Sequence, residues 1–446
     1  MLFYINLYTF LVGISKAAYT ALFNLYLKSL SYENSIIGNS TFYYSWGLAF
    51  GGLLFSSISD RIGRKKTLLV TMPLFSLAGL LRLIPTSYTL LYVFSFLFGF
   101  FDTSIILPTI SVIESSDEKK RLRNSNINFA IVMLTGVLGY FGAGLLSEKI
   151  GLVNSLRLSM ILALFSILPL FALPNTKLRV KRKKLKTNGK MYLNPVQLTM
   201  LFYYILSGAL VSAAAAVFIN FGNVIFLDLF LFSTTTITLI LTISQLSTAV
   251  TSLFTHKLTS KYGYKLLLFV LYLSVTLLIF MMPIFMLNSA LFTVAYILRY
   301  ILLNITTPMF MVFCLSYLPK SYLATFSGVS YFINNLMKAF SAQIFTHLSK
   351  SGTTNYSKLF LITGTFYLLN TIITLIAFVL IYIFKDKTDE KTQTTKLEQS
   401  KKNASVTSIK GFKHRRRIIS YQKDNSQKLS VHIHNSTTFK KNKDKK

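Results

Sequence analysis

Acidic residues are scarce in this chain, with 14 Asp and Glu among 446 residues against 47 Lys and Arg. Charged residues of both signs make up 14% of the sequence, well below the roughly 25% that soluble domains carry. Hydrophobic residues make up 52%, and the mean hydropathy is +0.53. This composition excludes an ordinary soluble domain and predicts an integral membrane protein.

Cysteine is nearly absent too, because Cys314 is the only one, and it lies in an apolar run. A lone cysteine excludes an intramolecular disulfide framework, a zinc site built on cysteines and an iron–sulfur cluster. The sequence also lacks paired carboxylates, a metal-ligand cluster and a nucleotide-binding loop. We therefore expect no enzyme activity, cofactor or metal, and no step driven by ATP.

Long apolar stretches fill most of the chain. A membrane-spanning helix needs about 20 mostly apolar residues, and we recognise twelve such stretches. They predict an all-α integral membrane protein with twelve transmembrane helices, at residues 4–27, 38–58, 67–85, 88–112, 125–147, 152–173, 196–223, 233–255, 266–287, 290–317, 322–347 and 357–384.

Basic residues in the loops predict the orientation. Without the C-terminal segment, twenty Lys and Arg lie in loops on one side and four on the other. Because cytoplasmic loops carry the excess of basic residues, the first side is predicted to be cytoplasmic and both termini to lie inside. We expect a monomeric, multi-pass protein of the plasma membrane.

Two polar segments divide the chain. The basic run Lys177–Lys186 follows Pro174 and precedes Pro195, which is typical of a linker. The predicted domains are an N-terminal six-helix bundle (1–173), a basic cytoplasmic linker (174–195), a C-terminal six-helix bundle (196–384) and a disordered basic cytoplasmic tail (385–446).

The tail carries 18 basic and 6 acidic residues and is too polar to bury a core. Its basic residues favour attraction to anionic lipid headgroups, worth about 1 kcal/mol for each one near the surface. A solvated extension that only reinforces the topology is the alternative. Nucleic-acid binding is not expected, because the tail contains no recognisable nucleic-acid-binding module.

A weak internal repeat has a period near 200 residues. Ser59–Lys65, which reads Ser-Asp-Arg-Ile-Gly-Arg-Lys, recurs as Thr259–Lys265, and Asn24 of the first stretch has a counterpart in Asn223 of the seventh. Parallel repeats of six helices are typical of the two halves of transporters.

The segment Ser56–Lys66 is similar to the signature loop between helices two and three of the major facilitator superfamily, Gly-x-Leu-x-Asp-Arg-x-Gly-Arg-Lys/Arg. Ser56 and Ile58 stand at its Gly and Leu positions. Together with the basic linker and the repeat, the resemblance covers about residues 1–384. It implies the fold of that family and a secondary transporter that works by alternating access.

The same loop predicts a conformational latch. A tight turn needs the backbone freedom of Gly63, and the Asp60 carboxylate can sit against the positive N-terminal end of a neighbouring helix. The resemblance implies that this helix is the eleventh, near Ser321, and that Arg64 pairs with Glu114. A loop that merely obeys the positive-inside rule is the alternative. The predicted latch comprises Asp60, Arg61, Gly63, Arg64 and Glu114.

Four charged residues, Lys16, Asp102, Arg299 and Lys338, lie near the middle of apolar stretches. Each costs at least ~2.5–3.5 kcal/mol at the bilayer centre unless it faces water or a partner. In the family that the chain resembles, helices one, four, seven and ten line the central cavity and helices two, five, eight and eleven flank it, so all four charges can reach it. The predicted cavity residues are Lys16, Asn24, Asp102, Asn223, Gln245, Arg299, Asn334 and Lys338.

Two further arginines, Arg82 and Arg157, lie near the outer ends of their apolar stretches. Long side chains at such positions reach the membrane interface at little cost. We therefore expect neither of them to take part in a site.

The predicted cavity indicates the class of substrate. Three bases against one acid give a formal charge of +2, which favours an organic anion as the small-molecule substrate. Because burial disfavours the charged form of a carboxyl group, Asp102 is the candidate carrier of a coupling proton. A structural ion pair between Asp102 and one of the bases is the alternative.

Two other functions stay open. The glycines at 136, 139, 142 and 144 resemble an antiporter motif of the same family, with Phe141 at its proline position, and would fit a proton-coupled multidrug exporter. Small residues at this spacing also serve as plain helix-packing contacts. The second function is a non-transporting receptor or sensor that keeps the transporter fold.

Deletion of the tail from Lys385 onward should leave solute flux intact in vesicles of neutral lipid, because no predicted spanning helix or cavity residue lies in it. Flux is measured with the purified truncated chain, and its insertion is checked by protease protection. Complete loss of flux by a correctly inserted truncation would contradict our interpretation of the tail.

Overall fold

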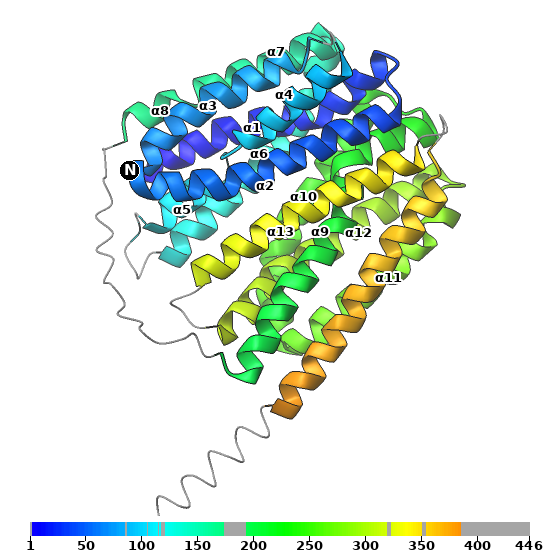
Figure 1. Ribbon diagram of the computed structural model, residues 1–446. Coiled ribbons are helices and arrows are strands. Elements are labelled where there is room, and N and C mark those ends of the chain that lie inside the picture. The colour runs from blue at the N-terminus through cyan, green and yellow to red at the C-terminus, as the bar shows by residue number, and fades with distance from the viewer. Residues whose placement is uncertain are drawn as a thin grey trace, which may run out of the picture. The chain divides into compact units, whose positions relative to one another are not determined.

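A computed structural model describes residues 2–84, 87–104, 106–114, 116, 121–173, 193–318, 323–349 and 354–384 (Figure 1). Within these ranges the regular elements are helices. They are α1 (Leu2–Ser29), α2 (Asn34–Ile62), α3 (Arg64–Leu81), α4 (Tyr88–Phe100), α5 (Ile106–Glu114), α6 (Arg121–Ile150), α7 (Leu152–Phe165), α8 (Leu168–Phe171), α9 (Pro195–Phe230), α10 (Thr234–Tyr262), α11 (Tyr264–Phe285), α12 (Ser289–Tyr317), α13 (Leu323–Leu348) and a last helix at Tyr356–Phe384. Most of the predicted linker and the predicted tail lie outside the described residues.

The helices coincide with the predicted apolar stretches, but two stretches that we expected to be single helices are broken. The stretch 88–112 is divided into α4 and α5, and the stretch 152–173 into α7 and α8. Proline explains both breaks, because it lacks an N–H and its ring clashes with the carbonyl four residues earlier. The residue four positions before Pro108 is Ser104, which lies within the first break. The residue four positions before Pro169 is Phe165, the last residue of α7.

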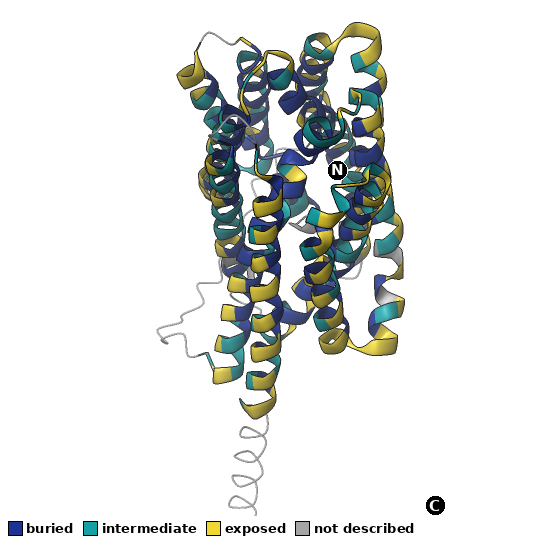
Figure 2. Cartoon of the chain, turned by 90° about the vertical axis from the view of Figure 1, so that its right-hand side faces the viewer, coloured by how far each residue is buried: buried dark blue, intermediate teal, exposed yellow. Residues whose placement is uncertain are grey.

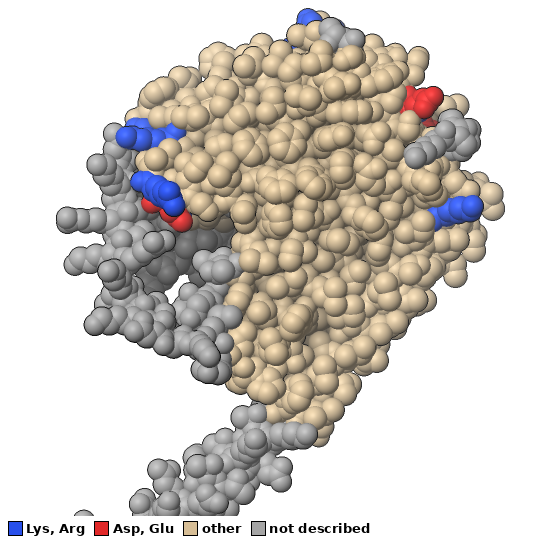
Figure 3. Space-filling model, viewed as in Figure 1, with Lys and Arg blue, Asp and Glu red and all other residues tan. Residues whose placement is uncertain are grey.

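Seven helices of the described chain are long and apolar enough to cross a membrane, by length and composition. They are α1, residues Ile127–Ile150 of α6, the segment Leu152–Phe171, α9, α11, α12 and the last helix. The outward sides of the helices carry exposed residues, many of them large and apolar (Figure 2). In Figure 3 the few visible charged side chains lie at the margins of an otherwise uncharged face. An apolar belt of this kind suits contact with lipid.

The helices form two sequential groups. In Figure 1, α1 to α8 lie together, and α9 to α13 and the last helix lie beside them. Between the groups, α2 packs against α13 and α6 packs against α10, while α1 contacts α9. The described residues up to Ile381 form one compact unit. The division into two six-helix bundles joined by residues 174–195 stays a prediction.

We name the two ends of the helices by the predicted orientation. The outer end holds the connections at residues 30–33, 231–233 and 286–288, and the inner end holds those at Gly63 and Gly263. Gly63 has a φ of 97° and Gly263 a φ of 75°. Only glycine adopts this left-handed backbone readily. At both positions this conformation lets the chain reverse direction between two long helices.

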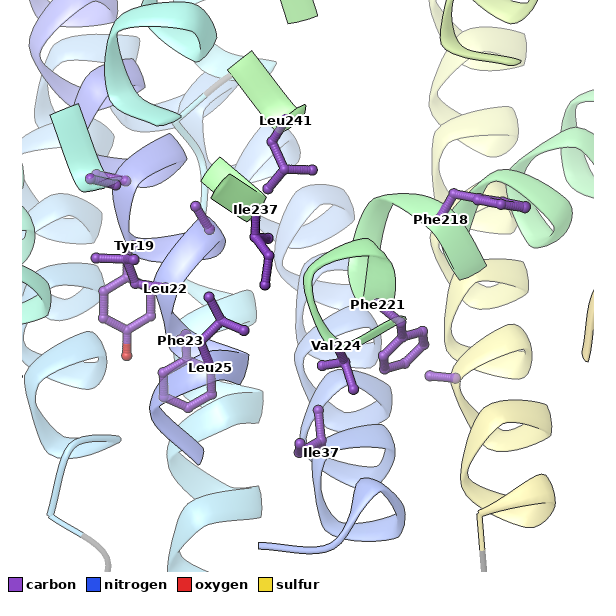
Figure 4. Close-up of a cluster of buried hydrophobic side chains, with 14 of the residues drawn as sticks. Tyr19, Leu22, Phe23, Leu25, Ile37, Phe218, Phe221, Val224, Ile237 and Leu241 are labelled. Atoms are coloured by element: carbon purple, nitrogen blue, oxygen red, sulfur yellow. The ribbon is translucent and has the colours of Figure 1, made fainter. Parts of the chain in front are cut away.

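The main apolar core belongs to both helix groups. Figure 4 shows Leu22 and Phe23 of α1, Phe221 and Val224 of α9 and Ile237 of α10 converging in one cluster. A second core cluster, which includes Met200, Tyr272 and Cys314, draws its residues from the second group alone. The two groups are therefore joined by apolar packing around the outer parts of α1 and α9.

Helices α2 and α4 pack through glycine. A Cβ atom on Gly47 or Gly51 of α2 would clash with the backbone of α4, and one on Gly99 of α4 would clash with the carbonyl oxygen of Tyr44. The absence of side chains therefore lets the two backbones come into contact. This close approach brings Tyr44 next to the end of α4, where the helix breaks.

Gly99→Ala should lower the stability of the protein by about 1–3 kcal/mol, the usual cost of overpacking. Gly142→Ala is the matched control, because a Cβ there meets nothing within 4 Å and alanine favours the helix by roughly 1 kcal/mol. Thermal unfolding of both purified variants in detergent checks the prediction. Equal melting temperatures for the two would contradict the proposed backbone contact.

Candidate functional site

Asp102 lies at the break between α4 and α5 and is only 2% exposed. Its Oδ2 atom is 2.6 Å from the Nζ atom of Lys16 on α1 and accepts a hydrogen bond of 3.0 Å from the Tyr44 hydroxyl on α2. Its Oδ1 atom accepts a hydrogen bond of 2.5 Å from the Ser104 hydroxyl. A buried carboxylate is thus surrounded by one cation and two hydroxyl donors from three parts of the first helix group.

The helix break itself supplies part of this site. The Ser104 backbone N–H also points at Asp102 Oδ1, at 3.3 Å, which forms a local turn that replaces helical hydrogen bonding. The Thr103 hydroxyl bonds that of Thr71 on α3 at 2.7 Å. The irregular backbone is therefore anchored to its neighbours, and irregular backbone at membrane depth is tolerated only where protein or a water-filled cavity surrounds it.

Lys338 brings the second helix group to the same site. Its side chain on α13 is half-buried, donates to Asn335 Oδ1 at 3.2 Å and interacts electrostatically with both Lys16 and Asp102. Lys16 keeps a side-chain exposure of 20%. Three of the four predicted mid-span charges thus share one site with a net charge of +1, and the Lys16–Asp102 pair lies within one group, as the structural alternative expects.

Arg299 of α12 lies in different surroundings. It is 1% exposed, and its Nη2 atom donates to the Tyr367 hydroxyl at 3.1 Å and to the Ala215 carbonyl at 3.3 Å. Its guanidinium lies over the ring of Phe218, 4.5 Å from the centroid, while its Nε has no hydrogen-bond partner. The contacts described for Arg299 are within the second group and do not include Lys16 or Asp102.

Asn24 and Asn223 join α1 to α9. Asn24 Nδ2 donates to the Asn220 carbonyl at 2.6 Å and lies 3.4 Å from Asn223 Oδ1, while Asn223 Nδ2 donates to the Ala21 carbonyl at 2.8 Å. Both side chains are buried. The two asparagines that the repeat relates to each other therefore bond reciprocally across the contact between the groups.

The remaining predicted cavity residues lie at helix contacts. Gln245 of α10 packs against Gly136 of α6 and donates to the Met133 sulfur at 3.4 Å. Asn334 of α13 packs against Gly208 of α9, and its Oδ1 has no hydrogen-bond partner.

Three of the four spaced glycines of α6 also meet neighbouring helices. They are Gly136 and Gly144 facing α10 and Gly139 facing α1. Their described contacts are those of helix packing.

A polar clasp at the outer end went unnoticed in the sequence. Lys28 of α1 forms an ion pair of 2.9 Å with Asp228 of α9. The Asp228 carboxylate also accepts hydrogen bonds from Asn34 of α2 at 2.5 Å and from the Tyr356 hydroxyl at 2.6 Å. We call Lys28, Asn34, Asp228 and Tyr356 the outer clasp. The sequence indicates the outer clasp only through two opposite charges, Lys28 and Asp228, which lie one repeat period apart.

The expectation for Arg82 is wrong. Its side chain is only 5% exposed, with Nε donating to Ser95 at 3.1 Å and Nη2 to Ser40 at 3.2 Å. These hydroxyls belong to α4 and α2, about two turns from the outer ends of those helices, so the side chain extends inward rather than to the interface. Arg157, by contrast, is exposed.

The predicted latch is described in part. Asp60 forms an ion pair with Arg64 in the same loop, at 2.5 Å, and Arg64 also donates to the Ser56 carbonyl at 3.3 Å. Arg61 is exposed. The side chain of Glu114 and the residue Ser321 lie outside the described residues, so the pairing across helices stays a prediction.

Among the described residues, no group of three His, Cys, Asp or Glu side chains could hold a metal ion. The site described above therefore consists of an ion pair, hydroxyls and nearby cations.

The chain matches the family model of the Major Facilitator Superfamily over residues 5–342. No match is found among curated proteins. Among solved structures, it is similar to the D-xylose-proton symporter (15% identity, TM-score 0.69, covering 84% of this chain and 96% of that one). It is also similar to the nucleoside transporter NupG (17%, 0.63, 84% and 98%) and to the POT family transporter PepTSo (13%, 0.68, 86% and 98%).

These structural likenesses establish the fold, and the family model covers most of the chain. The signature loop, the helical fold and that match agree with one another. The chain therefore belongs to the Major Facilitator Superfamily and is a multi-pass membrane protein, a secondary transporter and not an enzyme.

Proposed function

We propose that this transporter couples the movement of a small organic anion to protons by alternating access, and that Asp102 carries the coupling proton. The observation that carries the proposal is the buried Asp102 carboxylate at the α4–α5 break, within 2.6 Å of Lys16. An ionisable residue inside a membrane is a functional candidate by default, because it is costly to retain. One of the similar structures is a D-xylose-proton symporter, which supports proton coupling but not the choice of solute.

Proton binding at Asp102 changes the charge balance of the site. With Asp102 ionised, its charge offsets that of Lys16, and Lys338 remains as the extra positive charge. When Asp102 takes up a proton, both lysines lose their counter-ion, so an anionic solute is drawn to the site. The charged and titratable groups that face Asp102 are Lys16 and Tyr8 of α1, Tyr44 of α2 and Tyr331 and Lys338 of α13.

Alternating access requires the two helix groups to separate at one end while they meet at the other. The polar contacts described between α1 and α9 lie in their outer parts, from Ala21–Asn223 to Lys28–Asp228. In this interpretation the outer clasp closes the outer end, and the latch of Asp60, Arg61, Gly63, Arg64 and Glu114 acts at the inner end in the opposite state.

The wider proposal includes the predicted topology. Twelve membrane passes place both termini in the cytoplasm, and the plasma membrane is the expected location. The basic linker at 174–195 connects two six-helix bundles that rock about the midplane, and the basic tail is available to anionic lipid headgroups.

Asp102→Asn should bind and exchange the solute but fail to accumulate it against a gradient, because asparagine mimics a permanently protonated acid. The test uses proteoliposomes with an inward proton gradient and the solute that most stabilises the wild type in a thermal-shift screen of organic anions, sugars and cations. Glu33→Gln is the control, because Glu33 is exposed at the outer end. Normal accumulation by Asp102→Asn would make the residue a purely structural ion-pair partner.

Asp228→Asn should weaken the outer clasp and shift the protein toward outward-open states. Loss of an ion pair of about 1 kcal/mol changes such a population roughly five-fold. The test introduces Thr20→Cys in a Cys314→Ala background. The readout is the rate at which a membrane-impermeant maleimide, added from the outer side, labels that cysteine. Exchanging the charges, with Lys28→Asp and Asp228→Lys together, should restore the slow rate; unchanged labelling in Asp228→Asn would show that the clasp is not a gate.

A further inference from the structure

Acidic residues are absent from a long part of the second helix group. No Asp or Glu lies between Asp228 and Asp386, whereas the same stretch contains Lys257, Lys261 and Lys265. Lys257 and Lys261 lie in the last two turns of α10, and Lys265 lies in the first turn of α11. We call these three lysines the basic corner. No acid nearby in the sequence balances their charge.

The lysines of the basic corner are exposed. Among the described residues, no ion pair includes any of the three. The Lys257 Nζ atom lies 6.0 Å from the centroid of the Phe254 ring, and the Lys261 Nζ atom lies 5.1 Å from that of the Tyr262 ring. Cation–π contacts at exposed sites are weak, so they leave the positive charge available to an anion.

An exposed apolar row on α10 leads to the basic corner. Its side chains follow one another at intervals of three or four residues, and the same spacing continues from Phe254 to Lys257 and Lys261. The row consists of Leu239, Ile243, Leu246, Val250 and Phe254. With 3.6 residues per turn, it lies on a different side of the helix from Thr238 and Gln245, which pack against α6. This row therefore faces lipid acyl chains, and the basic corner lies at its inner end, next to the headgroups.

The corresponding corner of the first helix group is built differently. There Asp60 forms an ion pair with Arg64. One repeat period later, Ser260 and Tyr264 stand at these two positions, so the second group has no such pair. The basic corner thus retains its lysines but lacks the acid that offsets a base in the first group, and it is not a copy of the predicted latch.

We propose that the basic corner binds the headgroup of an anionic phospholipid, with an acyl chain of that lipid along the exposed row of α10. Such a lipid supplies a negative charge for the three lysines and apolar cover for the row. The N-terminal end of α11 adds its partial positive charge beside Lys265. Anionic lipids give the cytoplasmic leaflet a negative potential that attracts basic residues, and the predicted orientation places the corner there. This lipid site is separate from the basic tail and independent of the transported solute.

Quenching of a single tryptophan by brominated lipid tests the proposal. The background is Trp46→Phe, because Trp46 is the only tryptophan of the chain, and Phe254→Trp introduces a reporter beside Lys257. The full-length protein is reconstituted into mixtures of phosphatidylcholine and phosphatidylglycerol, in which one lipid or the other carries bromine on its acyl chains. The two quenching curves should give a relative binding constant of at least about threefold in favour of phosphatidylglycerol at this position.

Removal of the three charges should abolish this preference. Lys257→Gln, Lys261→Gln and Lys265→Gln together should lower the relative binding constant to about 1. Lys→Arg changes at the same three positions should keep the preference, because arginine retains the charge. Leu54→Trp is the matched control reporter, since Leu54 lies at the corresponding position of α2 and is 44% exposed, against 48% for Phe254. Quenching at position 54 should not respond to either set of lysine substitutions.

Three results would overturn the proposal: equal quenching by the two brominated lipids at position 254, an unchanged preference after the three Lys→Gln changes, or the same loss of preference at position 54. The basic tail is present in every variant, so a preference that survives the loss of the three lysines does not belong to the basic corner. The measurement needs neither a solute nor a proton gradient, and its outcome is therefore independent of the coupling role of Asp102.

Discussion

A charge inside the hydrocarbon of a membrane must face water or meet a partner, and this requirement organises the interior of the transporter. Lys16 and Asp102 compensate each other between α1 and the break after α4, and Lys28 and Asp228 do so at the outer end. Arg82 and Arg299 lack such compensation in the described chain and rely on hydroxyls, carbonyls and aromatic faces. Charge balance therefore separates the paired sites, which hold helices together, from these two arginines, of which Arg82 lines a cavity.

The break between α4 and α5 makes the buried acid possible. A continuous helix would use its backbone groups internally, whereas here the Ser104 N–H and hydroxyl both point at the carboxylate. Glycine packing between α2 and α4 brings Tyr44 to the same place, where its hydroxyl adds a third donor. Local backbone chemistry and close helix packing thus combine to stabilise a charge that the membrane alone would reject.

The internal repeat has a direct physical expression at the contact of α1 and α9. Asn24 meets Asn223 and Lys28 meets Asp228, so positions about one repeat apart face each other between the two groups. Equivalent helices that meet in this way place polar pairs beside the apolar cluster that joins the two groups. Polar pairs at such a contact exchange one hydrogen-bonding partner for another or for water, which suits an interface that opens and closes.

Hydropathy, span length and the signature loop at Ser56–Lys66 predicted the helical membrane fold and the family from the sequence, because these signals are local. Prolines occur at both broken helices, but Pro73, Pro283 and Pro308 lie inside unbroken ones, so a proline by itself does not predict a break. The sequence also singled out Lys16, Asp102 and Lys338 by their cost, although their neighbours come from helices distant along the chain. Tertiary structure alone decides whether the Arg82 side chain extends inward or to the membrane interface. A long side chain at a helix end can extend to the interface or inward, and only the packing of Ser40, Ser95 and Phe23 around it makes the inward path favourable.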